Sequence, residues 1–175
     1  MITAEVDMNN TQLSIKIYGE EVLRQKAEPV TEFGSPLEEL FEEMLEVMRS
    51  KRGIGLAAPQ VGISKQFFIV EIEKDKNQIA LANPQIVYQS NDCESVEEGC
   101  LSVPGVYADV IRPHSIVMQG QNIQGETVQI TASGLLARAL QHEYDHLQGK
   151  LFIDYLDETQ LNDVHSALKK LSKRK

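Results

Sequence analysis

The residues best suited to chemistry lie together in residues 141–149, which read Gln-His-Glu-Tyr-Asp-His-Leu-Gln-Gly. His142 and His146 are four residues apart, so in a helix their imidazoles lie one turn apart on one face, about 5–6 Å between Cβ atoms. Both rings can reach one divalent metal, and the intervening Glu143 can handle the proton of a water bound to that metal. The segment therefore predicts a metal site that activates water for hydrolysis.

A third protein ligand distinguishes the classes of metallohydrolase. Metzincin-type proteases place a third histidine six residues after the second, where this chain has Phe152. Thermolysin-type enzymes take a glutamate from a later helix, but Glu158 follows Gly149 too closely for a full helix to intervene. Upstream, Cys100 offers a thiolate, and a Cys-His-His set with an open fourth position is typical of a catalytic zinc or iron site.

With Cys100 beside the histidine pair, the sequence resembles the peptide deformylase family. Three blocks carry the resemblance, in the order and at the separations of that family: 53–60 (GIGLAAPQ), 98–102 (EGCLS) and 141–146 (QHEYDH). The resemblance runs from about Ile15 to about Leu156. It predicts one catalytic domain over residues 13–175, with residues 1–12 as a loose extension outside it.

The resemblance implies a substrate and a mechanism. The substrate is the formyl group on the initiator methionine of newly synthesised polypeptides, which is released as formate. Water bound to the metal attacks the formyl carbon, and Glu143 acts as general base and then general acid. The side-chain amide of Gln60 and the backbone N–H of Leu101 are then the donors that stabilise the oxyanion.

The metal site implied by the resemblance has three protein ligands, Cys100, His142 and His146. The family typically uses ferrous iron, and Zn²⁺, Ni²⁺ or Co²⁺ can occupy the same ligands. Ligand type alone does not separate iron from zinc, because cysteine and histidine suit both. We expect one divalent metal, with Fe²⁺ as the physiological ion.

Substrate binding is also implied by the resemblance. Gly55 and the neighbouring backbone are expected to pair with the substrate as an added strand, which tolerates varied sequence after the methionine. Ile54 and Leu135 are expected among the apolar walls of the methionine pocket. Arg138 lies on the same helix as Leu135, at a position where some family members have an apolar residue. Glu98 and Arg112 match family positions that form a structural ion pair.

Two other interpretations of the same residues are open. The first is a metallopeptidase or another amidase that uses the same metal site, and a formylated peptide tested against an unblocked one separates it from a deformylase. The second is a catalytically silent binding protein with a structural metal. Glu143 and the missing fourth protein ligand argue against the second, because a structural site needs no general base and is usually closed.

The elements that position these residues can be predicted from periodicity. Ser35 as N-cap, Pro36 and Glu38 predict the start of a helix that runs to about Ser50. Ser133 is expected to cap the helix of the metal motif, and Gly149 to end it. Strands are predicted at 67–72, 79–87, 106–111, 115–119 and 127–131. The pattern favours an α+β fold of mostly antiparallel sheets around a central metal-binding helix, with a C-terminal helix.

Composition limits the other possibilities. A chain of 175 residues fits one domain. No apolar run approaches the roughly 18–20 residues of a membrane span, and residues 1–12 lack the pattern of a signal peptide. We therefore expect a cytoplasmic protein with no membrane contact. The net charge of −9 argues against general nucleic-acid binding, including DNA.

The basic charge is concentrated at the C-terminus. Residues 169–175 contain five lysines and arginines and no acidic residue. Asp157 and Gln160 predict the start of a terminal helix whose apolar side carries Leu161, Val164, Leu168 and Leu171. The resemblance implies ribosome contact through this helix, because members of the family dock on the ribosome in that way. The alternative is a solvated basic helix end.

Overall fold

The computed structural model describes residues 13–173, and within them helices and strands follow each other along the chain in the predicted order. The α-helices are α1 (Ser35–Ser50), α2 (Gly134–Leu147) and α3 (Glu158–Leu171), and short 3-10 helices are η1 (Glu21–Arg24), η2 (Ala58–Val61) and η3 (Phe152–Tyr155). The strands are β1 (Gly55–Ala57), β2 (Phe67–Val70), β3 (Ile79–Gln89), β4 (Cys93–Cys100), β5 (Val103–Pro113), β6 (Ser115–Gln121) and β7 (Thr127–Ser133).

The strands form two antiparallel sheets. The larger has the order β1-β2-β3-β6-β7, and the smaller consists of β4 and β5 alone. Strands β3 and β6 pair side by side in the large sheet. The β4–β5 hairpin is inserted between them in the chain. Strand β1 lies at the edge of that sheet. Among residues 13–173 it pairs only with β2, and its other edge is free for a further strand.

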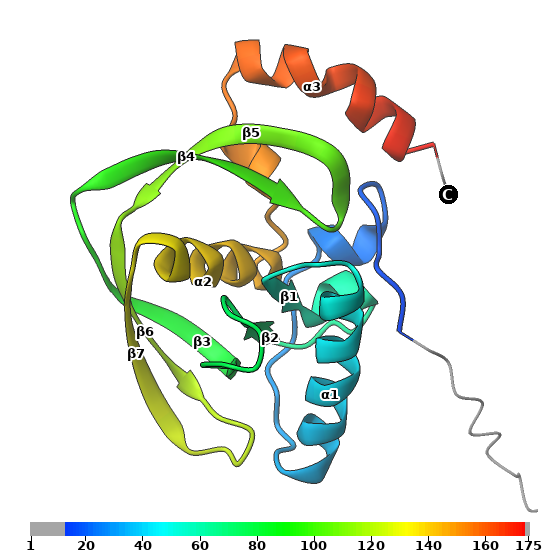
Figure 1. Cartoon of the computed structure of the whole chain (residues 1–175). Helices are drawn as coiled ribbons and strands as arrows, with labels where there is room; N and C mark the ends of the chain where they lie inside the picture. The colour runs from blue at the N-terminus through cyan, green and yellow to red at the C-terminus, as the bar shows by residue number, and fades with distance from the viewer. Residues whose placement is uncertain (1–12, 174–175) are drawn as a thin grey trace, which may run out of the picture.

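Helix α2 lies between the large sheet and the β4–β5 hairpin (Figure 1). Ala137, Leu140 and Leu147 of this helix are buried against Phe68 of β2 and Met118 of β6. The helix is therefore fixed on several sides by the core, and the side chains that it presents to the hairpin are held in place. This arrangement confirms the predicted α+β fold with mostly antiparallel sheets around a central helix.

Helix α1 packs on the other side of β1 and β2, with Phe41, Met44 and Met48 buried. Its predicted span is confirmed, but Ser35 is its first residue rather than its N-cap. The N-cap is Gly34, at φ 78°, a conformation that only glycine adopts without strain. The backbone N–H of Gly34 donates to Ile123 O at 2.7 Å, so this contact sets where the helix begins.

The five predicted strands are confirmed, and two strands were missed. Strand β4 has exposed, largely polar residues along most of its length, and its only aliphatic side chain is Val96. It therefore lacks the alternation of apolar and polar residues by which a half-buried strand is recognised. Strand β1 has only three residues and lies within the first motif block, residues 53–60, too short for a pattern of alternation.

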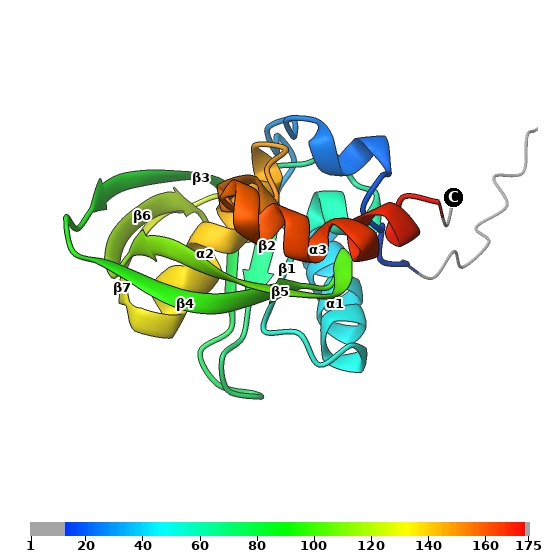
Figure 2. The same ribbon diagram turned by 90° about the horizontal axis from the view of Figure 1, so that it is seen from above.

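Helix α3 packs against β5 and η3 (Figure 2), where Leu168 and Leu171 are buried with Phe152 and Val106. The capping box at its start is confirmed, since Gln160 N donates to Asp157 Oδ1 at 2.9 Å. Leu161 does not join the buried side, because it is 39% exposed. The apolar side is therefore shorter than predicted.

Two sequence predictions fall on chain ends that lie outside the described residues. These are the loose extension at residues 1–12 and the last two basic residues, 174 and 175. Within residues 13–173, none of the helices is both long and apolar enough to cross a membrane.

Candidate active site

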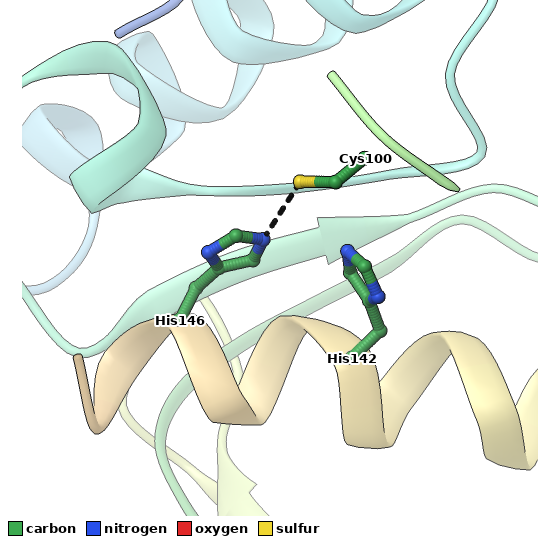
Figure 3. Close-up of side chains that lie close together, drawn as sticks. All are labelled: Cys100, His142 and His146. Carbon is green, nitrogen blue, oxygen red and sulfur yellow. Dashed lines mark hydrogen bonds between the residues drawn. The ribbon is translucent and has the colours of Figure 1, made fainter. Parts of the chain in front are cut away.

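The three predicted metal ligands meet at one point. Cys100, at the end of β4, faces His142 and His146, which stand one turn apart on α2 (Figure 3). One donor atom from each residue can be chosen so that all three lie within 4.8 Å of one another. The Sγ of Cys100 is 3.3 Å from Nε2 of His146. A thiolate and two imidazoles at these separations suit a single Zn²⁺ or Fe²⁺ ion.

His142 is oriented by a carboxylate behind it. Its Nδ1 lies 3.0 Å from Oε2 of Glu98, on strand β4. A proton on Nδ1 leaves Nε2 free to bind a metal, as in the carboxylate–histidine pairs of many metal sites. Burial alone would raise the pKa of Glu98, but hydrogen bonds from His142 and Arg112 outweigh it and hold that pKa at about 2.

Glu98 belongs to a buried ion network. Arg112 donates from Nε and Nη2 to Glu98 at 2.6 and 3.0 Å, which confirms the predicted ion pair. The same guanidinium donates from Nη1 to Oδ2 of Asp145 at 2.8 Å. The other oxygen of Asp145 accepts from the hydroxyl of Tyr155 at 3.0 Å. The network therefore connects β4, β5, α2 and η3 behind the metal ligands.

Glu143 lies between the two histidines in sequence and is buried. Its Oε2 has no hydrogen-bond partner among the described residues. Burial raises the pKa of Glu143 to about 7, because a buried carboxylate loses its hydration. A carboxyl group with a pKa in this range can both accept and deliver a proton near neutral pH.

Gln60 is held with its amide nitrogen toward Cys100. Its Oε1 accepts from the backbone N–H of Ala57 at 2.8 Å, which fixes the orientation of the amide. Its Nε2 then donates to Oγ of Ser102 at 3.2 Å and lies 3.4 Å from Sγ of Cys100. Leu101 follows Cys100 in the turn between β4 and β5. A buried amide donor and a turn backbone thus stand beside the metal ligands.

A cleft of about 1370 Å³ opens over these residues. Both predicted walls of the methionine pocket, Ile54 and Leu135, line it, together with Gly55 on strand β1. Ile54 is 40% exposed and Leu135 is 55% exposed, so both present apolar surface that a ligand could cover. The cleft combines apolar walls, one free strand edge and a few buried polar groups, which is typical of a binding site for a peptide.

Comparison with known proteins identifies the family. The family model described as Polypeptide deformylase matches residues 12–162. The chain belongs to this family. Its enzymatic class is therefore that of the peptide deformylases, and the predicted resemblance is confirmed.

Relatives in bacteria match most of the chain. A peptide deformylase from Endomicrobium trichonymphae is 42% identical over 163 residues, which cover 93% of this chain and 96% of the relative. Another from Hydrogenovibrio crunogenus is 45% identical over 146 residues, or 83% of this chain and 86% of the relative. These matches extend through all three motif blocks.

Solved structures of deformylases have the same fold. The enzyme from Thermus thermophilus aligns with a TM-score of 0.86 at 39% identity, over 91% of this chain and 96% of that one. The enzyme from Plasmodium falciparum aligns with a TM-score of 0.87 at 36% identity, over 90% of this chain and 94% of that one. The deformylase fold therefore covers about nine tenths of this chain.

The site contains residues to which the sequence analysis gave no role. Ser102 is fully buried and accepts from Gln60, but in the sequence it was only the last residue of the second motif block. The contact of Glu98 with His142 was also missed. Glu98 and Cys100 are two residues apart, and alternate residues of a strand share a face, so recognising β4 as a strand would have placed them together.

Proposed function

We propose that this deformylase removes the formyl group from the initiator methionine of nascent polypeptides by metal-dependent hydrolysis. The observation that carries the proposal is the meeting of Cys100, His142 and His146 within 4.8 Å, beside a buried Glu143, in a cleft with a free strand edge. The proposal assigns Cys100, His142 and His146 as metal ligands and Glu143 as the general acid and base.

The residues present fit one divalent metal. The three donors are the types that zinc and iron share, and the carboxylate oxygen of Glu143 beside them is buried without a partner among the described residues. Bound there, such an ion supplies Lewis acidity that lowers the pKa of water. We propose Fe²⁺ as the physiological ion, with Zn²⁺, Ni²⁺ or Co²⁺ able to replace it.

Proton movement is assigned to Glu143. Its carboxylate takes a proton from the attacking water and returns it to the nitrogen that leaves, which becomes the free amine of methionine. The C–N bond of the formamide breaks, and formate carries the new C–O bond. Burial raises the pKa of Glu143, which favours its holding the proton between the two steps.

Stabilisation of the negative charge that develops on the formyl oxygen is assigned to two hydrogen-bond donors. Gln60 presents Nε2 beside Cys100 because its Oε1 accepts a hydrogen bond from the backbone N–H of Ala57, which fixes the orientation of the amide. The backbone N–H of Leu101, in the turn after Cys100, is the second proposed donor. Donors held in place before the reaction stabilise the developing oxyanion without reorganisation.

Substrate binding is assigned to β1 and the walls of the cleft. Gly55 lies at the start of the edge strand β1, where an extended peptide can pair with the free edge. The methionine side chain is assigned to the region walled by Ile54 and Leu135. Main-chain pairing of this kind gives affinity with little dependence on the residues after methionine.

A formate-release assay tests this function. Protein purified without oxygen, with its metal content measured, is given formyl-Met-Ala-Ser or the unblocked Met-Ala-Ser. We expect formate from the first peptide and no cleavage of the peptide bonds in either. Cleavage of peptide bonds without formate would instead indicate a metallopeptidase.

We also propose that the enzyme works in the cytoplasm and contacts the ribosome through α3. Leu168 and Leu171 hold the helix against the domain, while Lys169, Lys170 and Lys173 are exposed. Exposed lysines on one helix end suit the phosphates of ribosomal RNA. Proximity to the nascent chain would raise the effective concentration of substrate.

Ribosome contact can be tested without disturbing the core. Deleting residues 169–175 would remove the buried Leu171, so replacing Lys169, Lys170 and Lys173 by alanine is the sharper change. A matched control replaces the exposed Lys26, Lys74 and Lys150 by alanine. We expect weaker co-sedimentation with ribosomes at low salt for the first variant only, with unchanged activity on short peptides. Equal co-sedimentation of both variants with ribosomes would indicate that the tail is only a solvated helix end.

A further inference from the structure

Arg138 stands on the cleft-facing side of α2. Leu135, Arg138, Ala139 and His142 are spaced three and four residues apart, so they share one face of the helix. All four line the cleft. The side chain of Arg138 is only 10% exposed, although arginine is rarely buried without partners. A charged residue between an apolar wall and a metal ligand therefore needs a physical explanation.

The guanidinium of Arg138 is paired with acceptors on both strands of the hairpin. Its Nη1 donates to Oε1 of Glu98 at 2.7 Å and to the backbone oxygen of Val110 at 2.9 Å. Its Nη2 donates to the backbone oxygen of Glu94 at 2.7 Å. These contacts attach α2 to β4 and β5 one turn before His142.

The acceptor on β4 is the same carboxylate that orients the metal ligand. Oε1 of Glu98 accepts from Arg138 and Arg112, while Oε2 accepts from Arg112 and faces Nδ1 of His142. Arg112 approaches Glu98 from β5, and Arg138 approaches it from the helix that carries His142. Removing Arg138 leaves the Glu98 carboxylate with Arg112 of β5 as its only guanidinium partner among the described residues, so its position relative to His142 is less defined.

We propose that Arg138 is a positioning residue that acts through Glu98 on His142, while its aliphatic stem completes the cleft wall between Leu135 and His142. The inference rests on the proposed function, because it takes His142 as a metal ligand. Residues that orient a metal-binding histidine typically change metal affinity by about 10–100-fold when they are replaced.

Cobalt binding to the metal-free protein provides the test. Co²⁺ is titrated into wild type and Arg138→Met, which keeps an apolar stem of similar shape but has no guanidinium. We expect Arg138→Met to bind Co²⁺ about 10–100-fold more weakly than wild type. Gln141→Met is the matched control, because Nε2 of Gln141 also attaches α2 to β5, through Pro113 O at 3.0 Å, without touching Glu98.

The control separates positioning from general support. Both variants should lower the free energy of unfolding of the metal-free protein, because each loses buried hydrogen bonds. Only Arg138→Met should weaken Co²⁺ binding. If Arg138→Met binds Co²⁺ as tightly as wild type, or if Gln141→Met weakens binding equally, Arg138 is structural and the proposal fails.

Kinetics with saturating Co²⁺ give a second readout. Because methionine preserves the apolar wall, KM for formyl-Met-Ala-Ser should change less than kcat in Arg138→Met. A rise in KM alone would show that Arg138 acts only as a wall of the cleft and would contradict a positioning role.

If Arg138→Met does not fold, Arg138→Lys replaces it as the test variant. A single ammonium cannot span the three acceptors, so Co²⁺ binding weaker than wild type supports the proposal, and wild-type binding contradicts it.

The failure of this inference is distinct from failure of the proposed function. In a chain that keeps Arg138, Cys100→Ser should lower the affinity for Co²⁺ if the proposed ligand set is correct. Unchanged affinity in Cys100→Ser would overturn the ligand set itself. Weaker binding in Cys100→Ser together with unchanged binding in Arg138→Met would overturn only the role of Arg138.

Discussion

The backbone of Gly55 lies directly against the carboxylate of Glu143. A Cβ atom built on Gly55 would lie 2.9 Å from Cδ of Glu143 and would overlap its Oε1. The first residue of the edge strand and the proposed general base are therefore in van der Waals contact. This closeness places the base beside the strand edge where we expect the substrate backbone to pair.

Replacing Gly55 by alanine should displace Glu143. The added methyl group cannot share the space of the carboxylate, so we expect a large loss of kcat/KM for formyl-Met-Ala-Ser with metal content unchanged. Gly53→Ala is the matched control, because its Cβ would lie 2.8 Å from Cδ1 of Leu101, 3.3 Å from Cγ of Met48 and 3.5 Å from the backbone oxygen of Gly55, and the tightest of these contacts is with the end of a side chain that can rotate. Equal activity in the two variants would contradict a tight fit between strand β1 and Glu143.

Replacing Glu143 by glutamine should separate metal binding from proton transfer. Glutamine keeps the shape and polarity of the side chain but cannot accept the proton of water. We expect full metal content and a loss of about 10²–10⁴-fold in kcat. A turnover number close to wild type would remove Glu143 from the mechanism.

Gln60→Leu should remove one oxyanion donor. We expect kcat to fall by about 10²–10³-fold, as at other oxyanion sites. The Michaelis constant should change much less, because the donor acts mainly in the transition state. Ser102→Ala is the control, since it removes the acceptor of Nε2 while Ala57 still holds the amide. An effect confined to the Michaelis constant would reassign Gln60 to substrate binding.

Stability should depend on pH through Glu71. Hydrogen bonds from Arg49, at 2.6 and 2.9 Å, hold the pKa of Glu71 at about 2, below its usual 4.5. A carboxyl with a lowered folded-state pKa contributes stability above the unfolded pKa and loses it as pH falls toward the folded pKa. Glu71→Gln should therefore lower the free energy of unfolding at pH 7, and its difference from wild type should shrink toward pH 3.

Denaturant unfolding at several pH values measures this difference. Glu73→Gln is the control in the same segment, because the ion pair of Glu73 with Lys76 is exposed and contributes little. A difference between wild type and Glu71→Gln that is the same at pH 7 and pH 3 would contradict the proposed contribution. The pair of Glu71 with Arg49 is connected to the cleft, because the backbone N–H of Glu71 donates to the backbone oxygen of Ile54, a residue of the cleft wall, at 2.8 Å.

The local parts of the fold and of the candidate site could be predicted from the sequence. The spacing of His142 and His146 fixes their relation on a helix, and the periodicity of α1 follows from its buried face. The Glu98–Arg112 pair was implied by the family resemblance, but the contact of β4 with His142 could not be predicted, because this strand has no apolar alternation. Its register, with Glu98 opposite Ala108, brings Glu98 to His142.

Long-range contacts between polar side chains were the other gap. Arg138 could be recognised as a departure from an apolar position, but its acceptors depend on how the hairpin lies against α2. Tyr155 likewise reaches Asp145 only because η3 folds back beside α2. Such contacts depend on the packing of elements that are distant in sequence, and a local pattern carries no information about that packing.

The most direct test of the central claim is a parallel measurement of metal content and formate release for wild type and Cys100→Ser, both purified without oxygen. Cys100→Ser changes one ligand atom and little else. We predict that wild type contains one divalent metal and releases formate from formyl-Met-Ala-Ser, and that Cys100→Ser loses both metal and activity. Full metal content with full activity in Cys100→Ser would contradict the Cys-His-His site.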